Sequence, residues 1–104
     1  MANQFGNRVR QLREQQQLLL RQVAPLLEVD TPLLSKIERG ERTAKKEQIV
    51  KLAQILKCSR EELLILWLAD QVYNIVKDED LAFKALSVTE EELKFKSKGK
   101  KKNN

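Results

Sequence analysis

The stretch from Asp30 to Arg42, DTPLLSKIERGER, carries the side chains with the clearest chemistry in this 104-residue chain. An aspartate can cap the first turn of a helix, a proline is tolerated directly after it, and Gly40 can adopt the left-handed conformation that ends a helix. The spacing predicts a short helix from Thr31, with Leu34 and Ile37 facing inward. Its outer face then presents hydroxyl and ammonium groups, which form hydrogen bonds to phosphates and to base edges.

The residue types that most enzymes need are scarce in this sequence. There is no histidine and one cysteine, Cys58, so the usual general base and the commonest metal ligand are missing and no intrachain disulfide can form. The sequence also shows no glycine-rich phosphate loop and no spaced cluster of metal ligands. We therefore expect no enzyme activity, no catalytic residue, no metal and no cofactor. Cys58 is interpreted as a packed thiol, with redox sensing as the alternative.

Charge is divided unevenly along the chain. Residues 1–58 carry 11 Lys and Arg against 6 Asp and Glu, residues 59–96 carry 5 against 9, and residues 97–104 add four lysines. The excess of basic charge in the first part favours a polyanionic partner there. Because the sequence has neither a long apolar run nor a charged and then apolar leader, we expect a cytoplasmic protein with no membrane partner.

Apolar residues recur with the period of helices, and no segment alternates with period two, so the sequence predicts an all-α fold. Besides the helix that begins at Thr31, helices are predicted at about residues 3–16, 20–27, 46–56 and 59–77. Two short helices are expected to follow, one after Asp78 and one from a capping box at Thr89. Residues 97–104 contain no apolar residue and are expected to be disordered.

The predicted helix at residues 59–77 has two apolar stripes rather than one. Leu63, Leu66 and Trp67 form the first stripe, which a small domain can bury. The second stripe consists of Leu64, Ile65, Leu68, Val72, Ile75 and Val76. It needs either a second copy of the chain or residues 79–95 folded back over it. We expect a two-fold dimer interface made by Leu68, Val72, Ile75 and Val76 with help from Phe83.

The pattern as a whole resembles the XRE family of helix-turn-helix proteins, which includes the phage repressors and Cro proteins. The resemblance covers about residues 3–66 and is carried by FGNRVRQLR at residues 5–13, by Val23-Ala24 and by the segment at residues 30–42. It implies a five-helix repressor-like DNA-binding domain at residues 1–70. A helical C-terminal extension for dimerisation then occupies residues 71–96, and the disordered basic tail occupies residues 97–104.

The resemblance also implies roles for individual residues. The residues expected to reach base edges from the recognition helix are Thr31, Pro32, Leu33, Ser35 and Lys36. Those expected to contact phosphates are Arg39, Arg42, Lys45 and Lys46, with Arg8 and Arg21 as secondary candidates. Arg13 and Glu38 are expected to form a structural ion pair. The sequence departs from the family pattern at Leu19 in place of a polar N-cap and at Leu20 in place of a polar residue that contacts a phosphate. It also departs at Pro25 inside the second helix and at Glu28 in place of a turn glycine.

Taken together, the resemblance implies a sequence-specific transcriptional regulator that binds double-stranded DNA as a homodimer. Repression is the expected mode, and control of a restriction-modification gene is one form that it takes in the family. Two alternatives remain open: an antitoxin, and a protein–protein adaptor that keeps the fold without direct DNA readout. The apolar surface of Pro32 and Leu33 is the best support for the adaptor, whose protein partner would be unknown.

Overall fold

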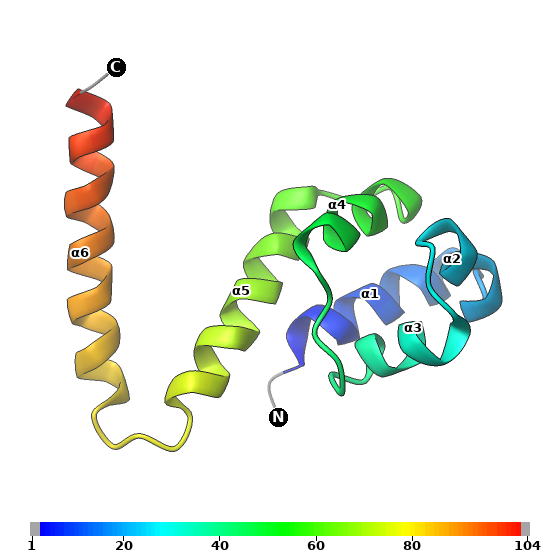
Figure 1. Ribbon diagram of the computed structural model, residues 1–104, viewed down its shortest axis with the longest axis horizontal. Helices are drawn as coiled ribbons and strands as arrows, with labels where there is room; N and C mark the ends of the chain where they lie inside the picture. Colours follow the sequence, from blue (N-terminus) through cyan, green and yellow to red (C-terminus); the bar gives the residue numbers. More distant parts are fainter. Residues whose placement is uncertain (1–2, 103–104) are drawn as a thin grey trace. The chain divides into compact units, whose positions relative to one another are not determined.

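Every regular element that the structure describes is a helix. The computed structural model describes residues 3–102, with side chains to residue 98, and no strand occurs in that range. The helices are α1 (Gln4–Gln15), α2 (Leu20–Leu26), α3 (Thr31–Glu38), α4 (Lys46–Ile55), α5 (Arg60–Val76) and α6 (Ala82–Lys102) (Figure 1). The predicted all-α fold is confirmed, and the first five helices begin and end close to their predicted bounds.

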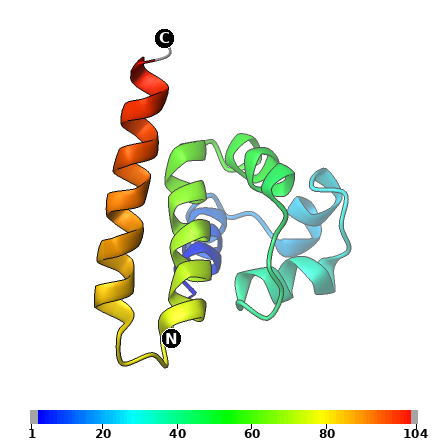
Figure 2. The same cartoon turned by 60° about the vertical axis from the view of Figure 1, so that its left-hand side comes forward.

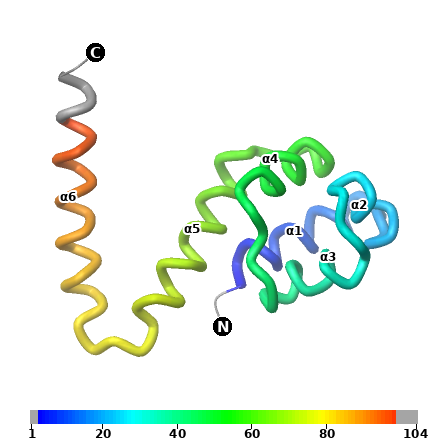
Figure 3. The backbone as a smooth tube through the Cα atoms, viewed as in Figure 1, coloured from blue at the N-terminus to red at the C-terminus, as the bar shows by residue number. Residues whose placement is uncertain are grey.

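The chain divides into two compact units, Met1–Asn74 and Ile75–Asn104, so the boundary lies in the last turn of α5. Within the first unit, α2 and α3 lie at one side and α5 lies at the opposite side (Figures 1 and 2). The backbone trace shows tight connections between α1, α2 and α3 and a more extended connection from α3 to α4 (Figure 3). The second unit contains α6.

The core of the first unit is built from the inward stripe of each helix. Its fully buried members include Val9 of α1, Val23 of α2, Leu34 and Ile37 of α3, Ile49 and Leu52 of α4, and Leu63 of α5. Leu18 and Leu20 pack against the edge of this core, whereas Leu19 between them is exposed. Two of the three consecutive leucines therefore serve local packing, which explains most of that apolar run.

Helix α1 approaches the end of α3 unusually closely because residue 6 is a glycine. A Cβ atom at Gly6 would overlap the carbonyl oxygen of Glu38, far inside ordinary van der Waals contact. Any side chain at this position would therefore push the two helices apart. The Asn3 amide reinforces the approach, because its Nδ2 donates to the same carbonyl at 2.8 Å.

A buried ion pair joins the same two helices. Arg13 Nε and Nη2 donate to the two carboxylate oxygens of Glu38 at 2.7 and 3.0 Å, and Nη1 donates to the carbonyl of Leu18 at 2.8 Å. Both residues are almost inaccessible, at 8% exposed for Arg13 and 5% for Glu38. The hydrogen bonds that Arg13 donates to Glu38 raise the pKa of Arg13 above its usual value in spite of burial. The forked geometry is what makes such a buried pair tolerable.

Four helices end in the same way, with one residue in the left-handed conformation. After α3 that residue is Gly40, at φ 78°, but after α1, α2 and α4 it is Gln17, Glu28 and Lys57, at φ 57°, 61° and 55°. The backbone bonds match a Schellman motif, as in Leu18 N–H to Arg13 C=O and Cys58 N–H to Ala53 C=O, both 3.0 Å. Glu28 thus adopts a left-handed backbone conformation that glycine adopts most readily.

Helix α5 begins as predicted, because the Ser59 hydroxyl accepts from the Glu62 N–H at 3.2 Å. Leu63 is fully buried, and Leu66 and Trp67 are half-buried against the core. One assignment needs correction: Leu64, placed in the second stripe from its angular position, also packs against the core. A helix that contacts both α1 and α4 buries a wider arc than a single stripe.

Helix α6 differs from its prediction in two respects. One helix runs from Ala82 to Lys102 where two short helices and then disorder from residue 97 were expected. Thr89 caps nothing, because its hydroxyl donates back to the carbonyl of Ala85 at 3.0 Å inside the helix. Lysine is a good helix former, so the basic segment extends a helix that has already nucleated. Residues 103 and 104 of the predicted tail lie outside the described residues.

The buried ion pair yields a stability prediction. Arg13→Met should lower the free energy of unfolding by about 3–5 kcal/mol, because it leaves the Glu38 carboxylate buried without a partner. Adding Glu38→Leu should restore most of that loss, since the double variant buries two apolar side chains instead. Urea denaturation followed by circular dichroism measures both effects.

Arg10 provides the matched control for this experiment. Its pair with Glu14 is solvent-exposed, with side chains 59% and 57% accessible. Arg10→Met should therefore cost less than about 0.5 kcal/mol. A loss for Arg13→Met no larger than that of Arg10→Met would contradict the structural importance of the buried pair.

Candidate nucleic-acid interface

Helices α2 and α3 form a short helical pair, and a side chain accepts a backbone N–H at the start of each. Asp30 Oδ1 accepts from the Leu33 N–H at 2.8 Å, which is the N-cap that the sequence predicts for α3. Leu19 cannot cap α2, but Gln22 Oε1 accepts from the Leu19 N–H at 2.8 Å instead. Pro25 lies in the last turn of α2, so its missing N–H removes only one helical bond.

The outer face of α3 contains the five residues predicted to reach base edges. Thr31, Pro32 and Lys36 are exposed, whereas Leu33 and Ser35 are half-buried. The Ser35 hydroxyl already accepts from Arg39 Nη1 at 2.8 Å, although its own proton stays available to donate. Lys36 is therefore the one charged donor on this face, and Thr31 and Ser35 supply its hydroxyl groups.

Basic residues follow α3, and one of them is already paired. Arg39 donates to the two carboxylate oxygens of Glu41 at 2.6 and 3.3 Å. Each member stabilises the charge of the other, since this hydrogen bond raises the pKa of Arg39 and lowers that of Glu41. Arg42, Lys45 and Lys46 are exposed and take part in none of the ion pairs found among the described residues.

The two secondary candidates for phosphate contact have different surroundings. Arg8 donates to Glu62 of α5 at 2.5 Å and to Gln11 at 2.7 Å, so its guanidinium is committed to holding α1 against α5. Arg21 is exposed on α2, next to the start of that helix. A phosphate contact by Arg8 would first require that the pair with Glu62 break.

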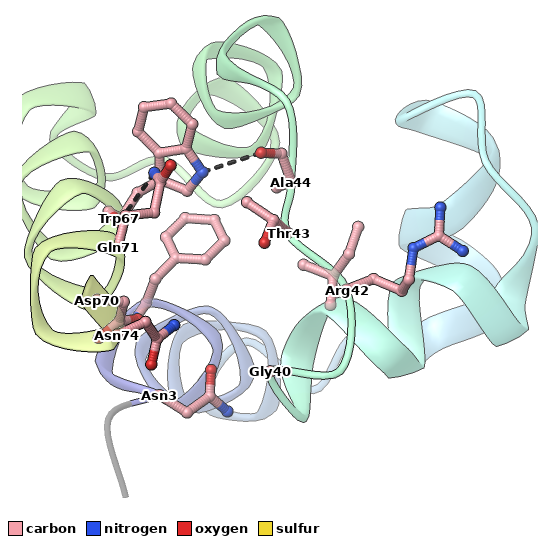
Figure 4. Close-up of a pocket in the computed structure, with 11 residues that line it drawn as sticks. Asn3, Gly40, Arg42, Thr43, Ala44, Trp67, Asp70, Gln71 and Asn74 are labelled. Carbon is pink, nitrogen blue, oxygen red and sulfur yellow. Dashed lines mark hydrogen bonds between the residues drawn. The ribbon is translucent and has the colours of Figure 1, made fainter. Parts of the chain in front are cut away.

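A second set of polar contacts, which no local sequence pattern predicts, surrounds a small hollow of about 50 Å³ between α1, the α3–α4 connection and α5 (Figure 4). The Asp70 carboxylate accepts from the N–H groups of Gln4 and Phe5 at 3.0 and 2.9 Å and so caps α1 from a distant helix. Trp67 Nε1 donates to the carbonyl of Ala44 at 2.9 Å. These partners are 65 or 66 and 23 residues apart in sequence, so no local motif identifies them.

The remaining reactive group is the thiol of Cys58. It is half-buried at the end of α4, where desolvation and the nearby Glu62 raise its pKa above the ordinary value. A raised pKa keeps the thiol protonated and weakly nucleophilic at neutral pH. Among the described residues there is no group of His, Cys, Asp and Glu suited to a metal ion.

Comparison with known proteins identifies the arrangement of the first unit. The family described as helix-turn-helix domain matches residues 4–64, which span α1 to the first turn of α5. The chain belongs to the helix-turn-helix family. Membership implies DNA binding by a regulator, with α3 as the helix that follows the turn. No curated protein and no solved structure matches the chain. No described helix of this helix-turn-helix protein is both long and apolar enough to cross a membrane.

The pairing of Arg39 with Glu41 generates a prediction about DNA affinity. Glu41→Gln should increase affinity for any duplex by about two- to fivefold, because it releases Arg39 and removes a negative charge that repels phosphates. The salt dependence of binding should become steeper. Fluorescence anisotropy with a labelled duplex at several salt concentrations measures both quantities.

Glu14→Gln serves as the matched control, because Glu14 is also an exposed partner of an arginine and the change in net charge is identical. If Glu14→Gln raises affinity as much as Glu41→Gln, the gain comes from net charge alone. That result would remove Arg39 from the set of phosphate contacts.

Proposed function

We propose that this protein is an XRE-type transcriptional regulator that recognises a specific sequence in double-stranded DNA and represses by covering an operator. The observation that carries the proposal is the exposed face of a rigidly capped α3 followed directly by exposed Arg42, Lys45 and Lys46. Recognition of a duplex needs both parts, a helix that presents side chains to base edges and cations that bind phosphates. A DNA partner also supports a cytoplasmic location.

In this proposal, α3 recognises bases through a small number of hydrogen bonds together with apolar contacts. Lys36 can donate to guanine O6 or N7, and Thr31 can touch a thymine methyl or hydrogen-bond a base edge. Pro32 and Leu33 supply apolar surface only. One α3 therefore discriminates weakly, and useful specificity requires two copies of the helix on one site.

Dimerisation is the second part of the proposal. Leu68, Val72 and Ile75 of α5 are 54%, 42% and 76% exposed, and Phe83 of α6 is 87% exposed. We assign these side chains, together with the half-buried Val76, to an interface with a second copy of the chain. An isologous interface would pair two recognition helices about 34 Å apart, the spacing of successive major grooves on one face of DNA.

The alternative with structural support is a protein–protein adaptor. Pro32 is exposed and Leu33 is half-buried at the start of α3, so an apolar partner could contact the face that DNA would otherwise occupy. Control of a restriction-modification gene also requires binding to an operator, so it is one form of the proposed regulatory function. An antitoxin would add a toxin partner to the same domain.

Substitutions on α3 and on the following loop separate specific from nonspecific contacts. Lys36→Ala should reduce the preference for a duplex selected from a randomised library over unrelated DNA by about tenfold. Arg42→Ala should weaken binding to both duplexes equally and make the slope of log affinity against log salt less negative by about one. Gel-shift titrations over a range of salt concentrations measure both effects.

The adaptor makes the opposite prediction in this experiment. If selection from the library enriches no sequence, or if Lys36→Ala leaves both affinity and preference unchanged, α3 does not read DNA as proposed. Lys77→Ala is the control for loss of a positive charge, because Lys77 lies beyond α5 and outside the matched domain.

Two charges on the exposed stripe of α5 test the dimer. Val72→Asp with Ile75→Asp should give a protein that sediments as a monomer at tens of micromolar, keeps its helical circular dichroism and loses tight binding to a two-half operator. Tyr73→Asp is the control, because Tyr73 lies about 100° around the helix from Val72 and is 47% exposed. A parent protein that is monomeric and still binds the full site tightly would refute the proposed interface.

A further inference from the structure

The connection from α3 to α4, residues 39–45, contains three of the four main candidate phosphate contacts, and hydrogen bonds fix both of its ends. At the start, the N–H groups of Glu41 and Arg42 donate to the carbonyl of Lys36 at 2.9 and 3.4 Å. At the end, the Lys45 N–H donates to Gln48 Oε1 at 2.8 Å. These bonds are local, so a contact with another helix is needed to hold the connection against the rest of the first unit.

Trp67 supplies that contact from α5. Its indole Nε1 donates to the carbonyl of Ala44 at 2.9 Å, and the Ala44 side chain is buried. The close-up shows the indole facing the connection across the hollow, while the Arg42 guanidinium points away from the indole (Figure 4). Ala44 directly precedes Lys45 and follows Arg42 by two residues, so holding its carbonyl limits where both cations can lie.

We propose that Trp67 is a positioning residue for DNA binding, which acts through Ala44 to hold Arg42 and Lys45 where they meet the phosphate backbone. The proposal rests on the proposed function and extends it to a helix that lies on the opposite side of the first unit from α2. A pre-positioned cation loses less conformational freedom on binding than a mobile one. The hydrogen bond from Trp67 to Ala44 should therefore increase the affinity for DNA.

The rest of α5 supports this role, because the same face of the helix holds the neighbouring elements in place. Asp70, one turn after Trp67, caps α1 through Gln4 and Phe5, and the Gln71 amide donates to the Trp67 carbonyl at 3.2 Å. The indole is therefore carried by a helix that is itself bound to α1. A fixed donor on a fixed helix is what positioning of the loop requires.

The test removes the indole N–H and retains an aromatic ring. Trp67→Phe should weaken binding to a selected duplex by about three- to tenfold and make the salt slope less negative, because one carbonyl loses its partner and the loop cations become less ordered. Measurements are made well below the melting temperature of each variant. Tyr73→Phe is the matched control, since it alters an exposed aromatic residue of the same helix.

A double-mutant cycle separates positioning from simple structural support. In a background of Arg42→Ala with Lys45→Ala, Trp67→Phe should have almost no further effect on affinity, because the cations through which it acts are gone. An equal loss in both backgrounds, or unchanged affinity and salt slope in the Trp67→Phe single variant, would overturn the proposal. Parent protein that binds no duplex would overturn the proposed function itself, and this inference with it.

A second replacement covers the case in which Trp67→Phe does not fold. Trp67 is the only tryptophan in the chain, so growth with β-(3-benzothienyl)alanine replaces it selectively. This analogue keeps the two-ring shape and has sulfur in place of the N–H group. The same weaker binding and shallower salt slope are expected, whereas parent-like DNA binding would show that the ring shape and not the hydrogen bond matters.

Discussion

The buried pair of Arg13 and Glu38 is the interaction on which the geometry of the DNA-binding unit depends. It lies where α1 meets the end of α3, and Arg13 also holds the Leu18 carbonyl just before α2 begins. One guanidinium thus links α1, α3 and the connection from α1 to α2. Because both charges are buried, neither residue can leave the pair without a large cost, so the orientation of α3 relative to α1 is strongly constrained.

The close approach of α1 to α3 follows from the same contact. Gly6 lets the two backbones come together, and the Glu38 carbonyl that would collide with a side chain there accepts from Asn3 instead. Glu38 therefore holds the C-terminal end of α3 twice, through its carboxylate and through its carbonyl. Asp30 holds the N-terminal end of the same helix. A helix fixed at both ends can present its outer face with little loss of freedom on binding.

Much of this fold could be predicted from the sequence because the signals are local. The apolar period of each helix, the caps at Asp30 and Ser59 and the glycine stop at Gly40 all act within a few residues. Contacts that cross the chain could not be predicted in the same way. Asp70 reads as an ordinary polar residue on α5, and only the three-dimensional arrangement shows that it caps α1.

The candidate site divides along the same line. The exposed face of α3 and the basic residues after it follow from spacing and from the family pattern, whereas the pairing of Arg8 with Glu62 and of Arg39 with Glu41 depends on how the helices and their ends pack. The length of α6 could not be predicted from the sequence for a different reason. A lysine-rich end is compatible with disorder and with helix, and composition alone does not show which state a preceding helix will impose.

The three left-handed residues that are not glycine have a consequence for how the protein can change over time. A left-handed conformation costs an ordinary residue about 1–2 kcal/mol more than a right-handed one, and glycine avoids this cost. Glu28 uses its side chain to pair with Lys51 at 2.6 Å, but the pair is exposed, and Gln17 and Lys57 make no side-chain bond among the described residues. Gln17→Gly after α1 or Lys57→Gly after α4 should therefore increase the free energy of unfolding, which the present sequence leaves below its maximum. That unused stability can offset destabilising substitutions on the exposed face of α3.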